Sequence, residues 1–372
     1  MHNTATDCII GWAPSGRIYV ASATFVPVQV PPSGGFFGIL FPFGGVTVTS
    51  TSDEGRSFTT PVVPISSEDL PGLFARGLTP SNSGFANPYD RPWLRVDLSS
   101  GDVYIAASGH PQYYVTVSHD EGQTWSRLEA LDCDETTPPS AHEVCGAYPA
   151  ITGALIDAAS GVLSAAYISS GTGCPCAIFE TSIDAGAHWQ RHVVASGLPA
   201  ASSVQVAANA RDRNKFAVSI LPSSRAALLV YTTRNFGASW SNPVSLGDLA
   251  VPHRLNRPWI AYSPQGRLGV FWRTAYPPFQ PSALQSGTQD VFVALSKNHG
   301  RTFASPVKIN VAPSPPPDPS QIVQDDTSFV ALSEHAIYAA WGDWRPTVGN
   351  PRGDLNTWFG RVPFKLFGDD DD

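Results

Sequence analysis

Runs of apolar and β-branched residues, each about the length of one strand, recur along the whole chain. Turns and loops rich in Gly, Pro, Asn and Asp separate them, a pattern typical of consecutive short strands. One clear series consists of Trp259–Ser263, Leu268–Thr274 and Asp290–Ser296. The end of the chain repeats this arrangement in Ser328–Leu332 and Ala336–Trp341. The pattern therefore predicts antiparallel β-strands that follow one another closely.

An eight-residue motif recurs five times at the same point of this pattern. It begins with Ser or Thr, has Asp or Asn two positions later and Gly two positions after that, and closes with Trp or Phe. The copies are Thr51–Phe58, Ser118–Trp125, Ser182–Trp189, Thr233–Trp240 and Ser296–Phe303. Self-similarity at a regular interval is the signature of a repeat architecture.

The residue types of the motif indicate a tight turn. An Asp or Asn side chain accepts hydrogen bonds from the amides of its own turn, and the Gly supplies a positive φ. The Ser or Thr hydroxyl can form a further hydrogen bond within the loop, and the closing aromatic packs on apolar neighbours. The strand-like runs before the copies are Gly45–Ser50, Tyr114–Ser118, Ile178–Ser182, Leu228–Thr232 and Val291–Ser296. We therefore interpret the motif as a structural hairpin turn, not as a catalytic element.

Composition agrees with a repetitive β-fold. The 372 residues include 32 Gly, 34 Pro, 19 Phe, 11 Tyr and 10 Trp, whereas Lys occurs only four times and Met once. Turn formers, β-branched residues and aromatics favour strands and loops, so a helical bundle or a doubly wound α/β fold is excluded. A hydrophobic content of 42% allows a sizeable core and excludes global disorder.

The motif resembles the Asp-box, also called the BNR repeat, of the sialidase superfamily, and its copies span nearly the whole chain. The resemblance implies an all-β, six-bladed β-propeller of four-stranded antiparallel blades, with each box joining the third and fourth strands on the face opposite the active site. A bare blade needs about 40–50 residues, and the longer intervals here leave room for loops. The expected blades of this single domain are residues 1–70, 83–132, 145–198, 200–248, 254–312 and 325–368, the last without a box.

Two expected blades begin their first strand in the same way. The sequence reads Asp-Arg-Pro-Trp at 90–93 and Asn-Arg-Pro-Trp at 256–259. A propeller gathers the ends of its inner strands around one axis, so these arginines are expected near the mouth of a central funnel. Trp93 and Trp259 are expected in the core. The alternative role for the two arginines is structural, as partners in salt bridges that cap the strand starts.

The resemblance further implies a substrate carboxylate held by three arginines, because a guanidinium fork matches two carboxylate oxygens. The candidates for this cluster are Arg91, Arg257 and either Arg273 or Arg345. Glycosidic cleavage also requires a carboxylic acid. The candidates for acid/base chemistry are Asp90, Asp326 and Asp343. Trp344, expected in a loop, is the aromatic residue best placed to stack on a sugar ring.

The chain also departs from the family pattern. Active sialidases carry an Arg-Ile-Pro element in the first blade, which is missing here, and a Tyr nucleophile polarised by a Glu. In the sixth blade, Tyr338 falls inside the second strand and is expected to pack. These departures keep two other functions open, namely a propeller that binds a glycan or a protein without cleavage, and a scaffold that docks a partner through the loop 24–44.

Charge and motif content exclude several other functions. The formal charge is −8, which argues against a nucleic-acid or anionic-membrane surface, and no apolar run is long enough for a membrane-spanning helix. No spacing of Cys and His predicts a metal site, and no phosphate or dinucleotide motif predicts a cofactor. The few lysines and a Cys133–Cys145 bridge favour an extracellular or periplasmic mature form, whereas the absence of a signal peptide favours the cytoplasm.

We therefore expect a glycoside hydrolase of the sialidase type that acts on an acidic or polar glycan in an arginine-lined central funnel. The partner would be the glycan itself, with no nucleic acid, membrane, metal or cofactor involved.

Overall fold

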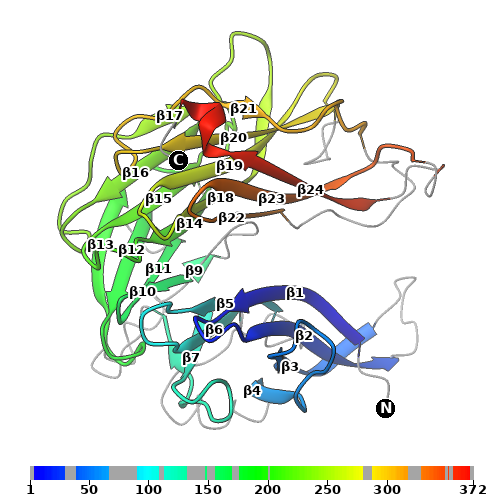
Figure 1. Cartoon of the computed structure of the whole chain (residues 1–372), viewed down its shortest axis with the longest axis vertical. Helices are drawn as coiled ribbons and strands as arrows, with labels where there is room; N and C mark the ends of the chain where they lie inside the picture. Colours follow the sequence, from blue (N-terminus) through cyan, green and yellow to red (C-terminus); the bar gives the residue numbers. More distant parts are fainter. Residues whose placement is uncertain are drawn as a thin grey trace.

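The computed structural model confirms the six-bladed β-propeller (Figure 1). It describes residues 4–29, 39–66, 90–108, 113–131, 147–148, 156–169, 176–199, 202–279, 287–316, 328–347, 351 and 355–368. Within each sheet consecutive strands pair antiparallel, so order along the chain and order in the sheet coincide. No helix in this part of the chain is long and apolar enough to cross a membrane.

The first three sheets take up the first half of the chain. The first contains β1 (Thr4–Trp12), β2 (Ile18–Gln29), β3 (Ile39–Thr51) and β4 (Val62–Ser66). The second contains β5 (Asp90–Val96), β6 (Val103–Ser108), β7 (Tyr113–Ser118) and β8 (Glu129–Ala130). The third contains β10 (Ile156–Ala159), β11 (Val162–Ser169), β12 (Cys176–Ser182) and β13 (Gln190–Ala195), and β9 (Ala147–Tyr148) also pairs with β11.

The remaining sheets continue the same meander. The fourth contains β14 (Ser203–Ala208), β15 (Phe216–Leu221), β16 (Leu228–Thr233) and β17 (Val244–Leu246). The fifth contains β18 (Arg254–Tyr262), β19 (Leu268–Ala275), β20 (Gln289–Ser296) and β21 (Val307–Lys308). The sixth contains β22 (Ser328–Leu332), β23 (Ala336–Asp343) and β24 (Asn356–Pro363), followed by the 3-10 helix η3 (Phe364–Phe367).

The five boxes form the predicted turns between the third and fourth strands of the first five sheets. In the second box, the Asp120 carboxylate accepts the amide of Thr124 at 2.8 Å and its hydroxyl at 2.6 Å. The Ser118 hydroxyl donates to the same carboxylate and accepts the amide of Gly122, both at 2.8 Å. In the other four boxes the first Ser or Thr makes the same two hydrogen bonds, and Oδ1 of the Asp or Asn accepts the amide four residues later. The sequence interpretation of the motif as a structural turn is confirmed.

Neighbouring blades pack face to face, and the second to fifth boxes contribute to this packing because the Gly of each one contacts the preceding sheet. Gly237 of the fourth box has a φ of 88° and is buried against Phe179 of the third sheet, where an added Cβ would lie 2.7 Å from the ring. The corresponding Gly55 of the first box lies in the open, and Phe58 beside it is 54% exposed. A box therefore packs on the blade that precedes it in the chain.

The ring has two distinct ends. The boxes and the turns between first and second strands lie together at one end, which we call the box end. There Ser160 donates to the carbonyl of Ala210, and Arg17 pairs with Glu121, across neighbouring blades. The starts of the inner strands and the loops between second and third strands lie at the opposite end, which we call the loop end.

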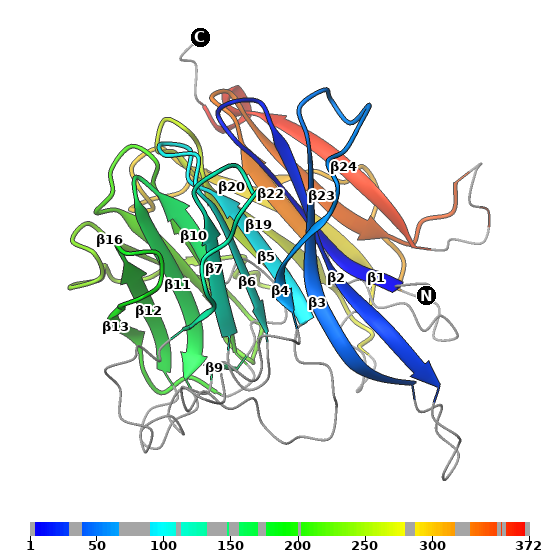
Figure 2. The same cartoon turned by 90° about the horizontal axis from the view of Figure 1, so that it is seen from below.

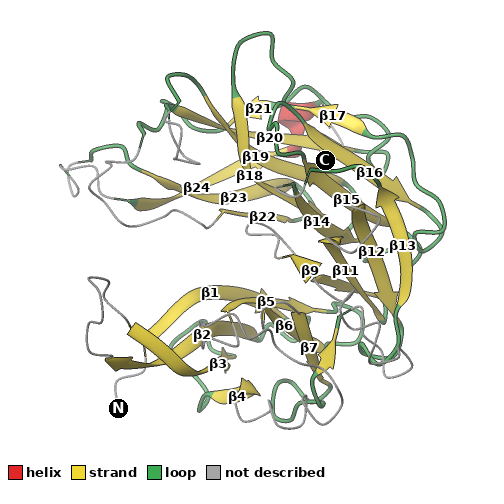
Figure 3. Ribbon diagram, turned by 180° about the vertical axis from the view of Figure 1, so that it is seen from behind, coloured by secondary structure: helices red, strands yellow, loops and turns green. Residues whose placement is uncertain are grey.

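The junction between the sixth and first sheets differs from the others. Inner strands pack in series from β1 through β5, β10, β14 and β18 to β22. The described parts of β22 and β1 do not pack in the same way, and Figures 1 and 3 show these two sheets apart. Ile10 and Trp12 of β1 are 60% and 52% exposed, so this face of the first blade is only partly covered.

The segment 24–44, expected as a loop, is mostly a hairpin. β2 continues to Gln29 and β3 starts at Ile39, with Thr24 opposite Gly45 and Val28 opposite Leu40. The register shifts between Val26 and Val28, because Pro27 between them has no amide hydrogen for the ladder. Figure 2 shows this hairpin extending away from the other sheets. The expectation of an irregular loop was wrong, since β-branched and aromatic residues on both sides continue the pairing.

Candidate functional site

The repeated Arg-Pro elements are both β-bulges at the loop end. In the fifth sheet Asn256 lies opposite Arg273 and Trp259 opposite Phe271, so Arg257 and Pro258 bulge out between the two pairs. The second sheet has the same shift between Asp90 and Trp93. Proline cannot donate to a ladder, which explains why both bulges fall at this dipeptide. Arg257 has a φ of 49°, a conformation that is rare outside glycine and is often retained for function.

Two of the expected arginines are buried at this bulge. Arg257 is 5% exposed and Arg273 is 1% exposed. Nη2 of Arg273 donates a 2.7 Å hydrogen bond to the hydroxyl of Ser328, at the start of the sixth sheet. The side-chain amide of Asn256 is buried beside them with no hydrogen bond among the described residues. A buried polar group without a partner is costly, so the Asn256 amide beside two buried arginines makes this cluster a candidate for ligand recognition.

Two further arginines, which sequence reasoning missed, stand at the same end. Arg225 lies in the loop between β15 and β16, and its backbone carbonyl accepts a 2.7 Å hydrogen bond from the amide of Leu255. The guanidinium of Arg254 lies 4.4 Å from the ring centre of Phe279. Burial lowers the pKa of Arg225, and the positive charge of Arg254 lowers it further. Positive charge therefore concentrates at the loop end of the fourth and fifth blades. The sequence signal for Arg225 was its position in a loop between second and third strands, because such loops lie at this end.

Asp343 and Arg345, assigned separate roles from the sequence, pair with each other. Asp343 is fully buried, and the Arg345 guanidinium donates to both of its oxygens, at 2.9 Å from Nη2 and 3.0 Å from Nε. The backbone amide of Arg345 donates to the same carboxylate at 2.8 Å. The Arg345 guanidinium also stacks on Trp358, 4.1 Å from the ring centre. Such a forked pair occupies both the carboxylate and the arginine.

The other expected residues have different positions. Trp344 follows β23 in a loop but is only 2% exposed, and its backbone amide donates to the Ser314 hydroxyl at 3.2 Å. Asp90 and Arg91 belong to β5, but their side chains lie outside the described part, as does Asp326. Trp93 and Trp259 are buried, as expected. The roles proposed for the site residues stay predictions.

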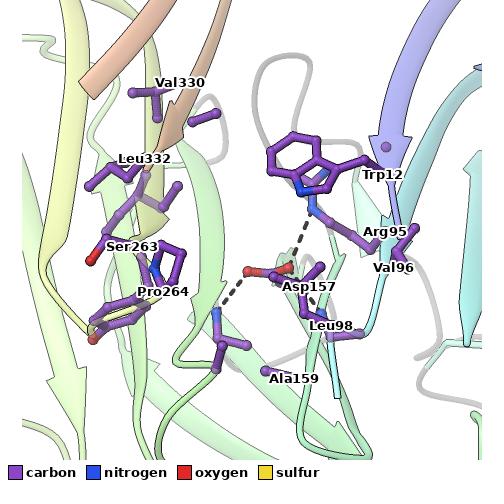
Figure 4. A pocket seen from close by; sticks show the side chains of 18 of the residues that line it. Trp12, Arg95, Val96, Leu98, Asp157, Ala159, Ser263, Pro264, Val330 and Leu332 are labelled. Atoms are coloured by element: carbon purple, nitrogen blue, oxygen red, sulfur yellow. Dashed lines mark hydrogen bonds and ion pairs between the residues drawn. The ribbon is translucent and has the colours of Figure 1, made fainter. Parts of the chain in front are cut away.

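A cavity of about 230 Å³ lies where the inner strands of all six sheets meet (Figure 4). Its walls are mostly apolar, and the charged residues among them are an ion pair between Arg95 of β5 and Asp157 of β10, with Nε and Oδ1 3.4 Å apart. The Asp157 carboxylate also accepts the amides of Ala208 at 2.8 Å and Ala158 at 3.0 Å. The guanidinium lies 5.7 Å from the ring centre of Trp259.

Burial governs the electrostatics of this pair. Desolvation raises the pKa of Asp157, and the positive charge of Arg95 opposes that rise. Desolvation likewise lowers the pKa of Arg95, and Asp157 opposes that fall. Sequence reasoning missed both residues. The available signal was a charged residue inside each inner-strand run, where the neighbours are apolar.

A buried tyrosine–glutamate pair lies in the third sheet. The Tyr167 hydroxyl donates a 2.6 Å hydrogen bond to Glu180, and both residues are fully buried in the third sheet. Tyr167 packs in the core between the second and third blades.

Two cysteines, Cys8 and Cys176, fall within the described part of the chain. Cys176 is disulfide-bonded, to a residue outside the described part, and Cys8 is free and exposed. The expected Cys133–Cys145 bridge lies outside the described residues. In the described ranges, no group of three or more His, Cys, Asp or Glu side chains is placed to hold a metal ion.

Comparison with known proteins identifies the fold. No protein-family model and no curated protein matches the sequence. Among solved structures, the Hadza microbial sialidase Hz136 is similar with a TM-score of 0.55 and 15% identity, over 98% of this chain and 66% of that one. The intramolecular trans-sialidase from Ruminococcus gnavus, in complex with oseltamivir carboxylate, has a TM-score of 0.55 and 11% identity, over 98% and 95% of the two chains.

A third similar structure has no assigned activity. It is a protein of unknown function from Dyadobacter fermentans, with a TM-score of 0.55 and 11% identity over 97% of this chain and 94% of that one. The chain thus has the fold of the sialidase six-bladed propellers. At these identities the likeness shows the fold alone, and chemistry has to be argued from the residues.

Proposed function

We propose that this protein recognises an anionic glycan at the loop end of its propeller and hydrolyses a glycosidic bond there. The observation that carries the proposal is the pair of buried arginines, Arg257 and Arg273, set at a bulge with a positive φ beside the buried amide of Asn256. Placing two guanidinium groups out of water is costly, and their position at the end of the inner strands suits a fixed anion site.

The chemistry of the arginines favours a carboxylate as the group recognised. A guanidinium fork binds two carboxylate oxygens at once, and two such groups stand together here. Arg225 and Arg254 add positive charge at the same end. An acidic sugar such as a sialic or uronic acid presents one carboxylate on a ring, and the propellers named above as sialidases share this fold.

Cleavage requires a carboxylic acid near the arginines. Since Asp343 is held by Arg345, Asp90 and Asp326 are the acids that we assign to proton transfer. Asp90 is the stronger candidate, because it opens β5 at a bulge equivalent to the one that carries Arg257.

A second function, binding without cleavage, is favoured by one observation. Asp343, one of the three acids expected from the sequence, is fully buried and paired, so it is not free to exchange protons with a substrate. A propeller with the arginines but without a working acid would bind an acidic glycan and leave it intact.

The deciding experiment measures turnover and binding on the same preparations. The purified protein is assayed with a 4-methylumbelliferyl sialoside and then with a 4-methylumbelliferyl glucuronide, and binding of sialyllactose and glucuronic acid is measured by calorimetry. We expect turnover by the wild type and a loss of about 100-fold or more in Asp90→Asn or Asp326→Asn, the size of a general acid contribution. Asp248→Asn, which changes an exposed carboxylate of the fourth blade, is the matched control.

The arginine variants separate the two functions. Arg257→Lys and Arg273→Lys retain the charge but lose the fork, so both should weaken binding, whichever function is correct. Saturable binding without turnover would establish the non-catalytic propeller. If the wild type neither binds nor cleaves any of these acidic sugars, the proposal is wrong.

A further inference from the structure

A second pocket, of about 350 Å³, lies at the box end between the fourth and fifth blades. It is walled by the two boxes of these blades and by the turns that join β14 to β15 and β18 to β19. Its basic lining residues are Arg211, Lys215, Arg234, Lys297 and Arg301. A chain with a formal charge of −8 thus concentrates five cations around one concavity.

Among the described residues, few opposing charges face these cations, and Lys297 donates a hydrogen bond to the carbonyl of Gly368. Asp212 is the acidic residue of the lining, and its carboxylate lies 2.9 Å from Nζ of Lys215. The guanidinium groups of Arg211, Arg234 and Arg301 are on exposed residues and make no hydrogen bond or ion pair within the described ranges. Like charges held together without counter-ions repel one another, so an anion in the pocket would be favoured.

The boxes at this pocket differ from the others at one position. The first three boxes have Asp at their centre, at 53, 120 and 184, whereas the fourth and fifth have Asn235 and Asn298. Asparagine makes the same turn, because its Oδ1 accepts the amides of Ser239 and Thr302, each at 3.0 Å. The turn therefore does not require the neutral side chain. What the change removes is a carboxylate, at the two boxes where the cations gather.

A buried residue of the pocket lining, His299, is held by two hydrogen bonds. His299 is 5% exposed, one ring nitrogen is hydrogen-bonded to the carbonyl of Thr233 at 2.9 Å, and the other to the hydroxyl of Tyr262. Burial lowers the pKa of His299, and the nearby Arg234 and Lys215 lower it further, so the ring is neutral at physiological pH. A ligand would thus meet this neutral ring together with the cationic side chains of the lining.

We propose that this pocket binds a small ligand carrying phosphate or sulfate groups. A tetrahedral oxyanion accepts from several arginines at once, and the pocket has room for the anion with one sugar or a group of similar size. The site lies at the opposite end of the ring from the loop-end arginines. The proposal of anion binding here is therefore independent of the proposed hydrolysis.

The test compares binding by the wild type with three variants, using calorimetry at low ionic strength. The ligands are inorganic phosphate, inorganic sulfate, glucose 6-phosphate and glucose 6-sulfate, so that free anions and sugar esters are distinguished. The Arg211→Gln/Arg234→Gln/Arg301→Gln variant should lose at least about tenfold in affinity. Asn235→Asp/Asn298→Asp should lose at least about threefold, since it adds one carboxylate to the lining, at 298, and one next to Arg234, at 235, while keeping the turns.

The control is Arg56→Gln, which removes an arginine at the same place in the first box as Arg301 holds in the fifth. Arg56 is 81% exposed and lies outside the pocket, so this variant should bind as the wild type does. Affinity in the wild type should also fall as NaCl is raised. The proposal is overturned if no ligand of the four binds, or if Arg56→Gln weakens binding as much as the triple variant.

Discussion

Arginines at the two ends of the ring are held in opposite ways. At the loop end, Arg273 is 1% exposed and donates to Ser328, and Arg345 is fixed by the buried Asp343. At the box end, Arg234 and Arg301 lie at the surface with no hydrogen bond or ion pair among the described residues. A buried charge must be compensated as the chain folds, whereas an exposed one is compensated by water until a ligand arrives. Substitutions at the two ends should therefore differ in kind.

The strongest effect is expected at the buried pair of the sixth blade. Asp343→Ala leaves the Arg345 guanidinium largely buried without its carboxylate, which should lower the free energy of unfolding by about 3–5 kcal/mol. Urea denaturation measures this loss. Adding Arg345→Met to the first change should recover part of the stability, because the uncompensated charge is removed. A loss below about 1 kcal/mol in Asp343→Ala would show that the pair is not a buried one.

The next effect separates an inner box from the first box. Gly237→Ala forces a Cβ against the Phe179 ring at a φ of 88°, so the strain of that conformation and the clash should together cost about 2–4 kcal/mol. Gly55→Ala meets only its own Phe58 and should cost about 1–2 kcal/mol. Equal losses in the two variants, measured by urea denaturation, would contradict the one-way packing of boxes on preceding blades.

The predictability of each feature depends on how far apart in the chain its parts lie. The boxes were predictable because their hydrogen bonds close within eight residues, and the bulges were signalled by Pro92 and Pro258. The Arg95–Asp157 pair was not, since it joins two blades whose alignment depends on the whole ring. Nor was the basic pocket, which four separate segments assemble. Asp343 and Arg345 were both predicted as site residues, but not as a pair. Although they are close in the chain, their pairing depends on the conformation of the turn after β23.

A third effect follows from the chemistry of the boxes. Hydrogen bonds from the hydroxyl and amide of Ser57 and from Thr51 hold the pKa of Asp53 at about 2, and Thr124 does the same for Asp120, against an ordinary value of 3.8. A lowered pKa in the folded state stabilises the protein above pH 3.8, and this contribution is lost as the pH falls toward 2. Asp53→Asn/Asp120→Asn should therefore show a melting temperature that depends less on pH between about 4 and 2.

The boxes with Asn235 and Asn298 provide an internal reference for this titration. They contain no carboxylate at the same place, so amide exchange in the fourth and fifth boxes should respond less to acid than in the first two. Equal acid sensitivity in all boxes would mean that the Asp carboxylates do not set it.

The smallest effect is expected at the box-end cations. The Arg211→Gln/Arg234→Gln/Arg301→Gln variant should change the free energy of unfolding by less than about 0.5 kcal/mol, since exposed side chains without partners contribute little. Any change should be a gain at low salt, because mutual repulsion is removed, and should vanish at high salt. A clear loss of stability would show that these arginines hold the fold together.

The contacts between each box and the preceding blade imply an order in which the blades can pack as the chain folds. Each box from the second onward completes its packing only when the preceding blade is present, as Gly237 does against Phe179. A nascent chain, which emerges from its N-terminus, would thus meet each support before the turn that needs it. Removing blades from the C-terminus should leave the remaining boxes supported, whereas removing the first blade would deprive the second box of Tyr19, against which Gly122 rests. The order of the blades is therefore directional: the first blade supports the second box, and each later blade is added at the C-terminal side.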